Sequence, residues 1–103
     1  MGIQISGYSF EGPYTGTGYL RHEQGVYSIL DKRVTGKWVV IDVGESEDVK
    51  DRVENHERKP CWERNRQGEL GVAVLYTPGW TAEQRRILEG RVREAFSPAC
   101  GVR

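Results

Sequence analysis

The sequence lacks any long hydrophobic run, and it is short of cysteine and of net charge. No window in the 103 residues approaches the roughly 20 consecutive apolar residues that span a bilayer, so nothing indicates a membrane protein. Residues 1–6 have neither the basic start nor the apolar core of a secretion signal, so we expect a cytoplasmic protein. The composition, 37% hydrophobic and 29% charged, is that of an ordinary soluble domain with one modest core.

Only two cysteines occur, Cys61 and Cys100. In a chain without a secretion signal, two cysteines are more often free thiols than a disulfide, and free thiols are our prediction. A structural zinc ion would need four ligands, and His22 and His56 are the only histidines that could join the cysteines. Their spacing matches no zinc pattern, so we predict no structural zinc.

The chain also lacks net charge, with 15 basic and 15 acidic side chains, but the two signs are unevenly placed. Residues 41–57 hold seven acids against two bases, whereas residues 58–103 hold nine bases against five acids. An overall basic charge would have favoured nucleic acid as partner. A local basic face is sufficient for such a partner, so nucleic acid stays open, although the acidic segment weighs against it.

The stretch 25–56 predicts two strands, a turn and a helix. Residues 26–30 and 38–43 are rich in β-branched and aromatic side chains, and Gly36 between them indicates an antiparallel hairpin. Because the second strand is almost continuously apolar, we expect it in the middle of a small sheet, covered on both faces. A helix capped by Ser46 should follow and carry Arg52 and His56 on one face.

The remainder of the chain predicts one further strand and a long final helix. Residues 70–76 are again apolar and read as the third strand, and residues 61–66 as one helical turn with Trp62 inward. Thr81 and Gln84 form a capping box that opens the last helix. Its apolar face is expected to comprise four residues, with Glu89 at the seam with the sheet: Leu88, Val92, Ala95 and Phe96.

Six side chains are candidates for chemistry: Tyr27, Asp42, Glu45, Arg52, His56 and Glu89. A carboxylate can hold a divalent cation that polarises a phosphate, and an arginine can offset charge on a pentavalent transition state. A phenol or a neighbouring imidazole can relay a proton from the attacking water. Together they suit phosphodiester hydrolysis. Each also has an ordinary structural alternative, such as a surface ion pair for Arg52 or a solvated helix position for Glu89.

The order of these motifs resembles the GIY-YIG nuclease family. Residues 25–27, Gly-Val-Tyr, match its first motif, and residues 42–44, Asp-Val-Gly, occupy the second, where the family has Tyr-Ile-Gly. Arg52 matches the arginine of the family's helix, and His56 falls where many members have histidine. Glu89 precedes Pro98 by nine residues, as the catalytic glutamate precedes a proline in the incision subunits of excision repair. The resemblance covers about residues 24–101.

The resemblance implies an α+β domain with a three-stranded, mainly antiparallel sheet flanked by helices. It divides the chain into an N-terminal extension, residues 1–23, that packs on a GIY-YIG-like domain, residues 24–103. It also implies DNA cleavage that depends on Mg²⁺ or Mn²⁺. In this scheme Tyr27 activates water, Arg52 binds the phosphate and Glu89 binds the metal, with His56 as a further catalytic residue.

Two departures from the family pattern add negative charge near the site. Asp42 replaces the second tyrosine, and Glu45 stands where many members carry lysine. A third departure is Gly101, which stands where many members carry asparagine. Carboxylates near a phosphate are repulsive unless a cation intervenes, so we expect Asp42 and Glu45 to join Glu89 as metal ligands. Arg85 and Arg86 of the last helix are the expected substrate-binding residues.

Two hypotheses therefore stand. The first is a metal-dependent DNA endonuclease, small enough that specificity would need a protein partner or a second subunit, as in a homodimer. The second is a catalytically inactive GIY-YIG-like module that binds protein or nucleic acid. The environment of Asp42 discriminates between them, since a metal ligand supports the first and an ion pair with Arg52 supports the second.

Overall fold

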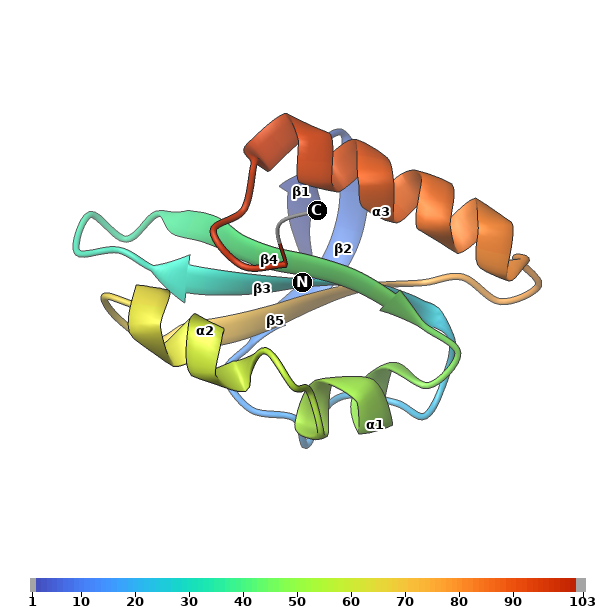
Figure 1. The fold of residues 1–103 in the computed structure, drawn as a ribbon, viewed down its shortest axis with the longest axis horizontal. Helices are drawn as coiled ribbons and strands as arrows, with labels where there is room; N and C mark the ends of the chain where they lie inside the picture. The colour runs from blue at the N-terminus through green and yellow to red at the C-terminus, as the bar shows by residue number, and fades with distance from the viewer. Residues whose placement is uncertain (1, 102–103) are drawn as a thin grey trace.

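The computed structural model describes residues 2–101 and shows a single sheet covered by helices on both faces (Figure 1). Helix α3 lies on one face, and α1 and α2 lie on the other. Within the described residues, no helix is long and apolar enough to span a membrane. The elements follow in the order β1 (Gly2–Ile5), β2 (Tyr8–Tyr14), β3 (Gly25–Lys32), β4 (Trp38–Ser46), α1 (Val49–Glu54), α2 (Lys59–Asn65), β5 (Leu70–Tyr76) and α3 (Ala82–Phe96).

The predicted α+β class with an antiparallel sheet is confirmed, but the sheet has five strands in place of three. The strand order is β1-β2-β5-β3-β4, and all neighbours are antiparallel. The two additional strands, β1 and β2, form a hairpin that pairs with β5 through β2. The N-terminal segment therefore extends the sheet itself.

The expectation that residues 38–43 form the middle strand is wrong, because β4 lies at the edge of the sheet. Its continuous apolar pattern has another cause, since helices cover both of its faces (Figure 1). The outer edge of β4 is covered by the chain's C-terminal segment. The backbone N–H of Cys100 donates to the Ile41 carbonyl at 2.9 Å, and Arg93 donates to the carbonyl of Val43. These contacts protect an edge that would otherwise expose unpaired backbone groups.

An irregularity in the pairing of β4 with β3 decides where Asp42 points. Ile29 pairs with Asp42, but Leu30 pairs with Val40, so Ile41 is the additional residue of a bulge. Strict alternation would place Asp42 with Val40, on the apolar face beneath α3. The bulge instead places Ile41 and Asp42 both toward the α1–α2 face, where Ile41 packs in the core.

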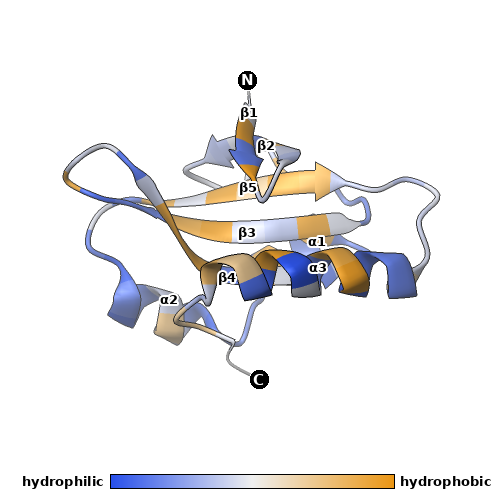
Figure 2. Cartoon of the chain, turned by 90° about the horizontal axis from the view of Figure 1, so that it is seen from above, coloured by the Kyte–Doolittle hydropathy of each residue, from blue (hydrophilic) through white to orange (hydrophobic). Residues whose placement is uncertain are grey.

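Each face of the sheet has its own apolar cluster. The cluster beneath α3 includes Leu88 and Val92 of the helix and is built from aliphatic side chains and one aromatic, Phe10. The cluster beneath α1 and α2 includes Val49, Val53 and Trp62. The hydropathy of the chain follows this arrangement, since β4 and β5 are largely apolar while α3 carries both apolar and charged bands (Figure 2).

Some of the predicted helix boundaries need correction. β4 continues to Ser46, so α1 is capped by Asp48 instead, whose carboxylate accepts the Asp51 N–H at 3.0 Å. The helix ends at Glu54, so His56 lies in the turn beyond it and not on the same helical face as Arg52. Helix α2 begins at Lys59, and Pro60 is tolerated in its first turn.

Helix α3 begins with the predicted capping box, in which Thr81 and Gln84 cap each other's backbone. Leu88, Val92 and Glu89 are buried as expected. Ala95 and Phe96 are exposed, contrary to the expectation. Ala95 is in phase with Leu88 and Val92 but is exposed, so the buried stripe of α3 ends at Val92.

The expectation of free thiols is wrong, because Cys61 and Cys100 form a disulfide with their Cα atoms 5.9 Å apart. The segment after α3 turns back along the edge of β4 and thereby brings Cys100 to α2. Thirty-nine positions separate the two cysteines in sequence, so nothing local in the sequence reveals this proximity.

Candidate active site

A cleft of about 480 Å³ lies where β4 meets α1, the α1–α2 turn and α3. Three of the four predicted catalytic residues, Tyr27, Arg52 and Glu89, line it although they come from three separate elements. Its other lining residues are Val43, Gly44, Glu45, Arg58, Arg86, Arg93 and Gly101. The cleft thus has a cationic wall of four arginines and contains two carboxylates.

Tyr27 reaches the cleft because Gly44 has no side chain. The two residues are paired across β3 and β4, and a Cβ atom on Gly44 would lie 2.2 Å from the Tyr27 hydroxyl oxygen. Any other residue at position 44 would therefore collide with the ring. The glycine of the second sequence motif has a direct steric role, which is to let the phenol cross β4.

His56 lies behind Tyr27, with its side chain fully buried. The Arg58 backbone N–H donates to Nδ1 at 3.0 Å, so the proton of the neutral imidazole is on Nε2. Nε2–H then donates to the Tyr27 hydroxyl oxygen at 2.8 Å. Burial, together with the positive charges of Arg52 and Arg58, lowers the pKa of His56 to about 4.

The Tyr27 phenol is protonated at neutral pH. Burial raises its pKa to about 12, and the nearby charges of Arg52 and Arg58 lower it only in part. Since the hydroxyl oxygen accepts from His56, the O–H bond is available to donate in another direction. The phenol lines the cleft and can bind a group there.

Arg52 is held by Glu57 through two hydrogen bonds of 2.6 and 2.9 Å. This bidentate pairing raises the pKa of Arg52, burial notwithstanding. The Glu57 side chain is 62% exposed, so it is a weakly held counter-ion that a phosphate oxygen can replace.

Asp42 is completely buried and is surrounded by donors. Its Oδ2 accepts from Arg58 Nε at 2.8 Å and from Trp62 Nε1 at 2.7 Å, and its Oδ1 accepts from Arg93 Nη2 at 3.0 Å. Burial pushes the pKa of Asp42 upward, but the hydrogen bonds from these three donors outweigh burial and hold the pKa below its usual value. With both oxygens bound and no exposed surface, Asp42 is not placed as the sequence analysis expected of a metal ligand.

The two other carboxylates at the cleft are also paired with arginines. Glu89 Oε2 accepts from Arg93 Nε at 2.9 Å, and Glu45 Oε2 accepts from Arg85 Nε at 2.9 Å. Arg85 is buried by this contact and does not line the cleft, in contrast to its expected role in substrate binding. The other expected substrate-binding residue, Arg86, does line it.

Among residues 2–101, no three His, Cys, Asp or Glu side chains come together as a metal site. Glu89 and Glu45 are the carboxylates that line the cleft. Magnesium is typically held by one or two carboxylates, with water and substrate phosphate oxygens completing its shell. The donor set of the cleft fits such an ion.

Sequence reasoning missed Arg58 and Arg93. In the sequence, Arg93 is one of several arginines of the last helix and nothing distinguishes it from the others. The excess of bases after residue 57 does not indicate which of them reach the cleft. Arg58 lies between two short helices, where no periodicity assigns a direction to its side chain.

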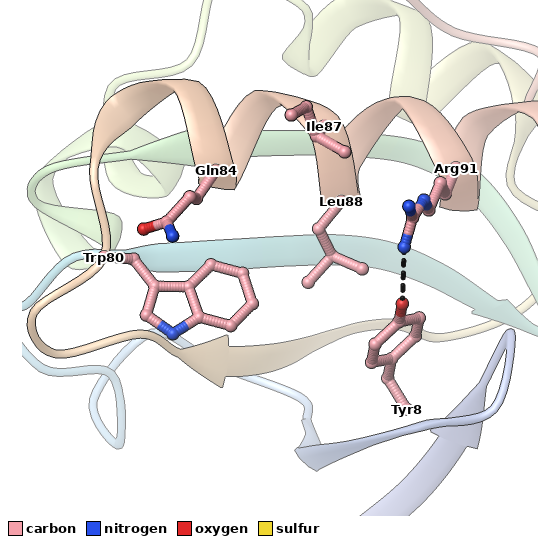
Figure 3. A pocket seen from close by; sticks show the side chains of 6 residues that line it. All are labelled: Tyr8, Trp80, Gln84, Ile87, Leu88 and Arg91. Atoms are coloured by element: carbon pink, nitrogen blue, oxygen red, sulfur yellow. Dashed lines mark hydrogen bonds between the residues drawn. The ribbon is translucent and has the colours of Figure 1, made fainter.

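A smaller hollow of about 190 Å³ lies against a different face of α3 (Figure 3). Leu88 of the helix points toward the rings of Trp80 and Tyr8, and Arg91 donates to the Tyr8 hydroxyl at 3.3 Å. No predicted site residue lines this hollow.

Neither a family model nor a curated protein matches this chain. A solved structure does match, the GIY-YIG N-terminal endonuclease domain of UvrC from Thermotoga maritima, a point mutant bound to its catalytic divalent cation. The TM-score is 0.59 with 21% sequence identity, over 84% of this chain and 91% of that domain. At this identity the likeness establishes the fold alone. The chain has a GIY-YIG-like fold, as its motifs predicted.

Proposed function

We propose that this chain is a metal-dependent endonuclease that hydrolyses phosphodiester bonds of DNA in the cleft. The observation that carries the proposal is the convergence of Tyr27, Arg52 and Glu89 on one cleft, with His56 bonded to the phenol. These are the residue types that such a hydrolysis needs, and they lie on a GIY-YIG-like fold. The UvrC domain supports the proposal, since it is described as an endonuclease with a catalytic divalent cation.

Glu89 would hold the cation, Mg²⁺ or Mn²⁺, with Glu45 as a second carboxylate at the same cleft. When bound, such an ion supplies Lewis-acid stabilisation of charge on the phosphate and the leaving oxygen. The Glu89–Arg93 pair fixes the orientation of the carboxylate through a short and buried contact. We do not assign Asp42 a part in holding metal.

Tyr27 would act as a relay and not as a preformed base, because a phenol with a pKa of about 12 is not ionised at neutral pH. Its hydroxyl oxygen can accept a proton from the attacking water while its own O–H proton passes to a phosphate oxygen. His56 holds the phenol in place through Nε2–H. Arg52 would bind the phosphate after exchange with Glu57 and stabilise charge in the transition state.

A second candidate function is that of a non-catalytic module that binds DNA or protein. The observation that favours it is the pairing of every carboxylate near the cleft with an arginine, as in Glu89 with Arg93 and Asp42 with Arg58. Such pairs also occur in purely structural ion-pair networks, which shift the pKa values of carboxylates in proteins that have no catalytic site there. The two candidates differ in whether the cleft binds a divalent cation.

The deciding experiment combines calorimetric titration with Mn²⁺ and a plasmid-nicking assay. We expect wild type to bind Mn²⁺ and to nick the plasmid, and Glu89→Gln to lose both activities. Tyr27→Phe should still bind Mn²⁺ but nick the plasmid at least about 100-fold more slowly. Glu94→Gln is the matched control, because Glu94 is exposed on the same helix and does not line the cleft. A wild-type protein that neither binds Mn²⁺ nor nicks would leave the binding module as the function.

A further inference from the structure

We infer that Arg58 is a second phosphate-binding arginine of the cleft, held in its binding orientation by Asp42. The inference deepens the proposed function, because it concerns how the same cleft binds the backbone of DNA. It rests on the contacts of Arg58, on the space next to its guanidinium and on a comparison with the other arginines of the cleft.

The backbone of Arg58 is fixed by the imidazole that also holds the phenol. Arg58 is the residue directly before α2, and its N–H donates to His56 Nδ1 at 3.0 Å. The imidazole is buried and bonded to Tyr27 on its other side. The position of Arg58 is therefore tied to the position of the proposed proton relay.

The guanidinium of Arg58 is fixed by Asp42 through two hydrogen bonds. Nε donates to Oδ2 at 2.8 Å, and Nη2 donates to Oδ1 at 3.3 Å. Asp42 cannot turn away from this contact, because Trp62 and Arg93 hold the same carboxylate and none of it is exposed. A buried carboxylate with this many donors is a rigid support for an arginine at the surface.

The Arg58 guanidinium keeps donors for a ligand. Its side chain is 29% exposed, and both N–H groups of Nη1 have no acceptor among residues 2–101. An anion can therefore bind Nη1 while the contact with Asp42 stays intact. Because the orientation is set before binding, little rotamer entropy is lost when a ligand binds.

Arg93 and Arg52 differ from Arg58 in availability, while Arg86 is exposed. Arg93 is only 12% exposed and is used internally, since it donates to Glu89, Asp42 and two backbone carbonyls. Arg52 must exchange its partner Glu57 before it binds a phosphate. Arg58 is thus the arginine of this group that is both held by a buried partner and open to the cleft.

Gly101 leaves the space beside the Arg58 guanidinium open. A Cβ atom at position 101 would lie 3.0 Å from Arg58 Nε and 2.9 Å from both Arg93 Nη2 and Asp42 Oδ1. The backbone φ of +73° also disfavours any other residue there. A side chain at this position would press on the Asp42–Arg58 pair, whereas glycine leaves the partly exposed Arg58 guanidinium at the wall of the cleft.

The ligand that this arrangement fits is the phosphodiester backbone. Arg58 and Arg86 line the same cleft as Arg52, while the charge of Glu45 is offset by Arg85. Guanidinium groups bind phosphate oxygens without reference to the base, so the contact positions DNA and carries no sequence preference. Each such contact releases counterions and adds about 0.9 to the slope of log K against log salt for duplex DNA.

The test measures binding of a short DNA duplex by fluorescence anisotropy at several salt concentrations, with a chelator present so that no cleavage occurs. We expect Arg58→Ala to weaken binding and to reduce the magnitude of the salt slope by about 0.9. Arg64→Ala removes the same charge from an exposed position of α2 outside the cleft and should leave the slope unchanged. If Arg58→Ala does not fold, Arg58→Gln, which can still donate to Asp42, replaces it.

Nicking kinetics on the same variants separate phosphate binding from support of His56. A phosphate contact predicts that Arg58→Ala raises KM more than it lowers kcat and that Arg58→Lys restores much of the loss. A slope that is unchanged in Arg58→Ala, or wild type that does not bind the duplex, overturns the inference. If wild type nicks and the slope is unchanged, only the inference is wrong. If the slope falls but wild type never nicks, the inference holds and the cleft belongs to a binding module.

Discussion

The two hollowed sides of α3 differ in chemistry far more than in size. On the cleft side, of about 480 Å³, Glu89 and Arg93 join a chain of short polar contacts that reaches Asp42 and Arg58. On the other side, of about 190 Å³, the side chains are mostly apolar and the one hydrogen bond among the lining residues joins Arg91 to Tyr8 (Figure 3). An apolar hollow is common on protein surfaces, whereas a buried set of charges needs a reason.

Buried charges are costly, and this cost distinguishes the two sides. A buried ion pair contributes little net stability compared with apolar packing, yet loss of one partner is strongly destabilising. The cleft side therefore retains Asp42, Arg58 and Arg93 in an arrangement that stability alone does not favour. We interpret the arrangement as selected for function, since it orients charged groups toward the cleft.

The sharpest test of this comparison is removal of charge at its centre. Asp42→Asn leaves Arg58 and Arg93 without their buried anion and should lower the free energy of unfolding by about 3–5 kcal/mol. On the other side of α3, Ile87→Ala should change it by less than about 0.5 kcal/mol, because Ile87 is 51% exposed. Urea denaturation of both variants measures the two values. Equal effects would show that the two sides of the helix do not differ energetically as we argue.

The disulfide extends the comparison to residues 97–101, which contribute Gly101 to the cleft. Closing a loop with a sequence separation of 39 restricts the unfolded chain and is worth about 3–4 kcal/mol. Reduction of the disulfide should lower the free energy of unfolding by this amount, which urea unfolding of wild type with and without a thiol reductant measures. After reduction, hydrogen exchange should be faster at the Cys100 amide, which donates to the Ile41 carbonyl. If the urea concentration at the midpoint of unfolding is the same with and without the reductant, the disulfide does not stabilise the fold as expected.

Acidification should destabilise the cleft side through His56. The pKa of His56 is about 4 in the folded protein and about 6.5 when unfolded, so the unfolded chain binds its proton first as pH falls. The stability from neutral His56 is complete above pH 6.5 and decreases below it, by about 2–3 kcal/mol at pH 4. Denaturation across this range compares wild type with His56→Asn, which cannot titrate and should show a flatter profile. If wild type and His56→Asn lose stability equally as the pH falls, His56 is not the cause of the acid destabilisation.

Local sequence signals predicted the elements well where one segment decides the outcome. Thr81 and Gln84 specify the start of α3 by contacts within four residues, and the apolar run of residues 70–76 matches β5. The order of motifs around Tyr27, Arg52 and Glu89 was sufficient to name the fold, because it resembles the GIY-YIG family. The structure adds that glycine at position 44 and tyrosine at position 27 are sterically linked.

The prediction failed where an element's neighbours decide the outcome. The apolar pattern of β4 could not distinguish a central strand from an edge strand covered by helices and by the C-terminal segment. Asp42 was expected to bind metal and Arg85 to bind substrate. A bulge in β4 instead directs Asp42 toward the α1–α2 face, and the contact with Glu45 buries Arg85.

The sequence by itself determined the strands β3, β4 and β5, the start of α3 and the types of residue that gather at the cleft, because helix caps and strand periods act over short distances. Only the tertiary structure decided which charges pair. Asp42 bonds to residues 16, 20 and 51 positions away, and Cys100 bonds to Cys61 across the domain. Sequence periodicity does not indicate which partner a charged side chain will pair with. The packing of β4 between α2 and α3 determined the partners of Asp42.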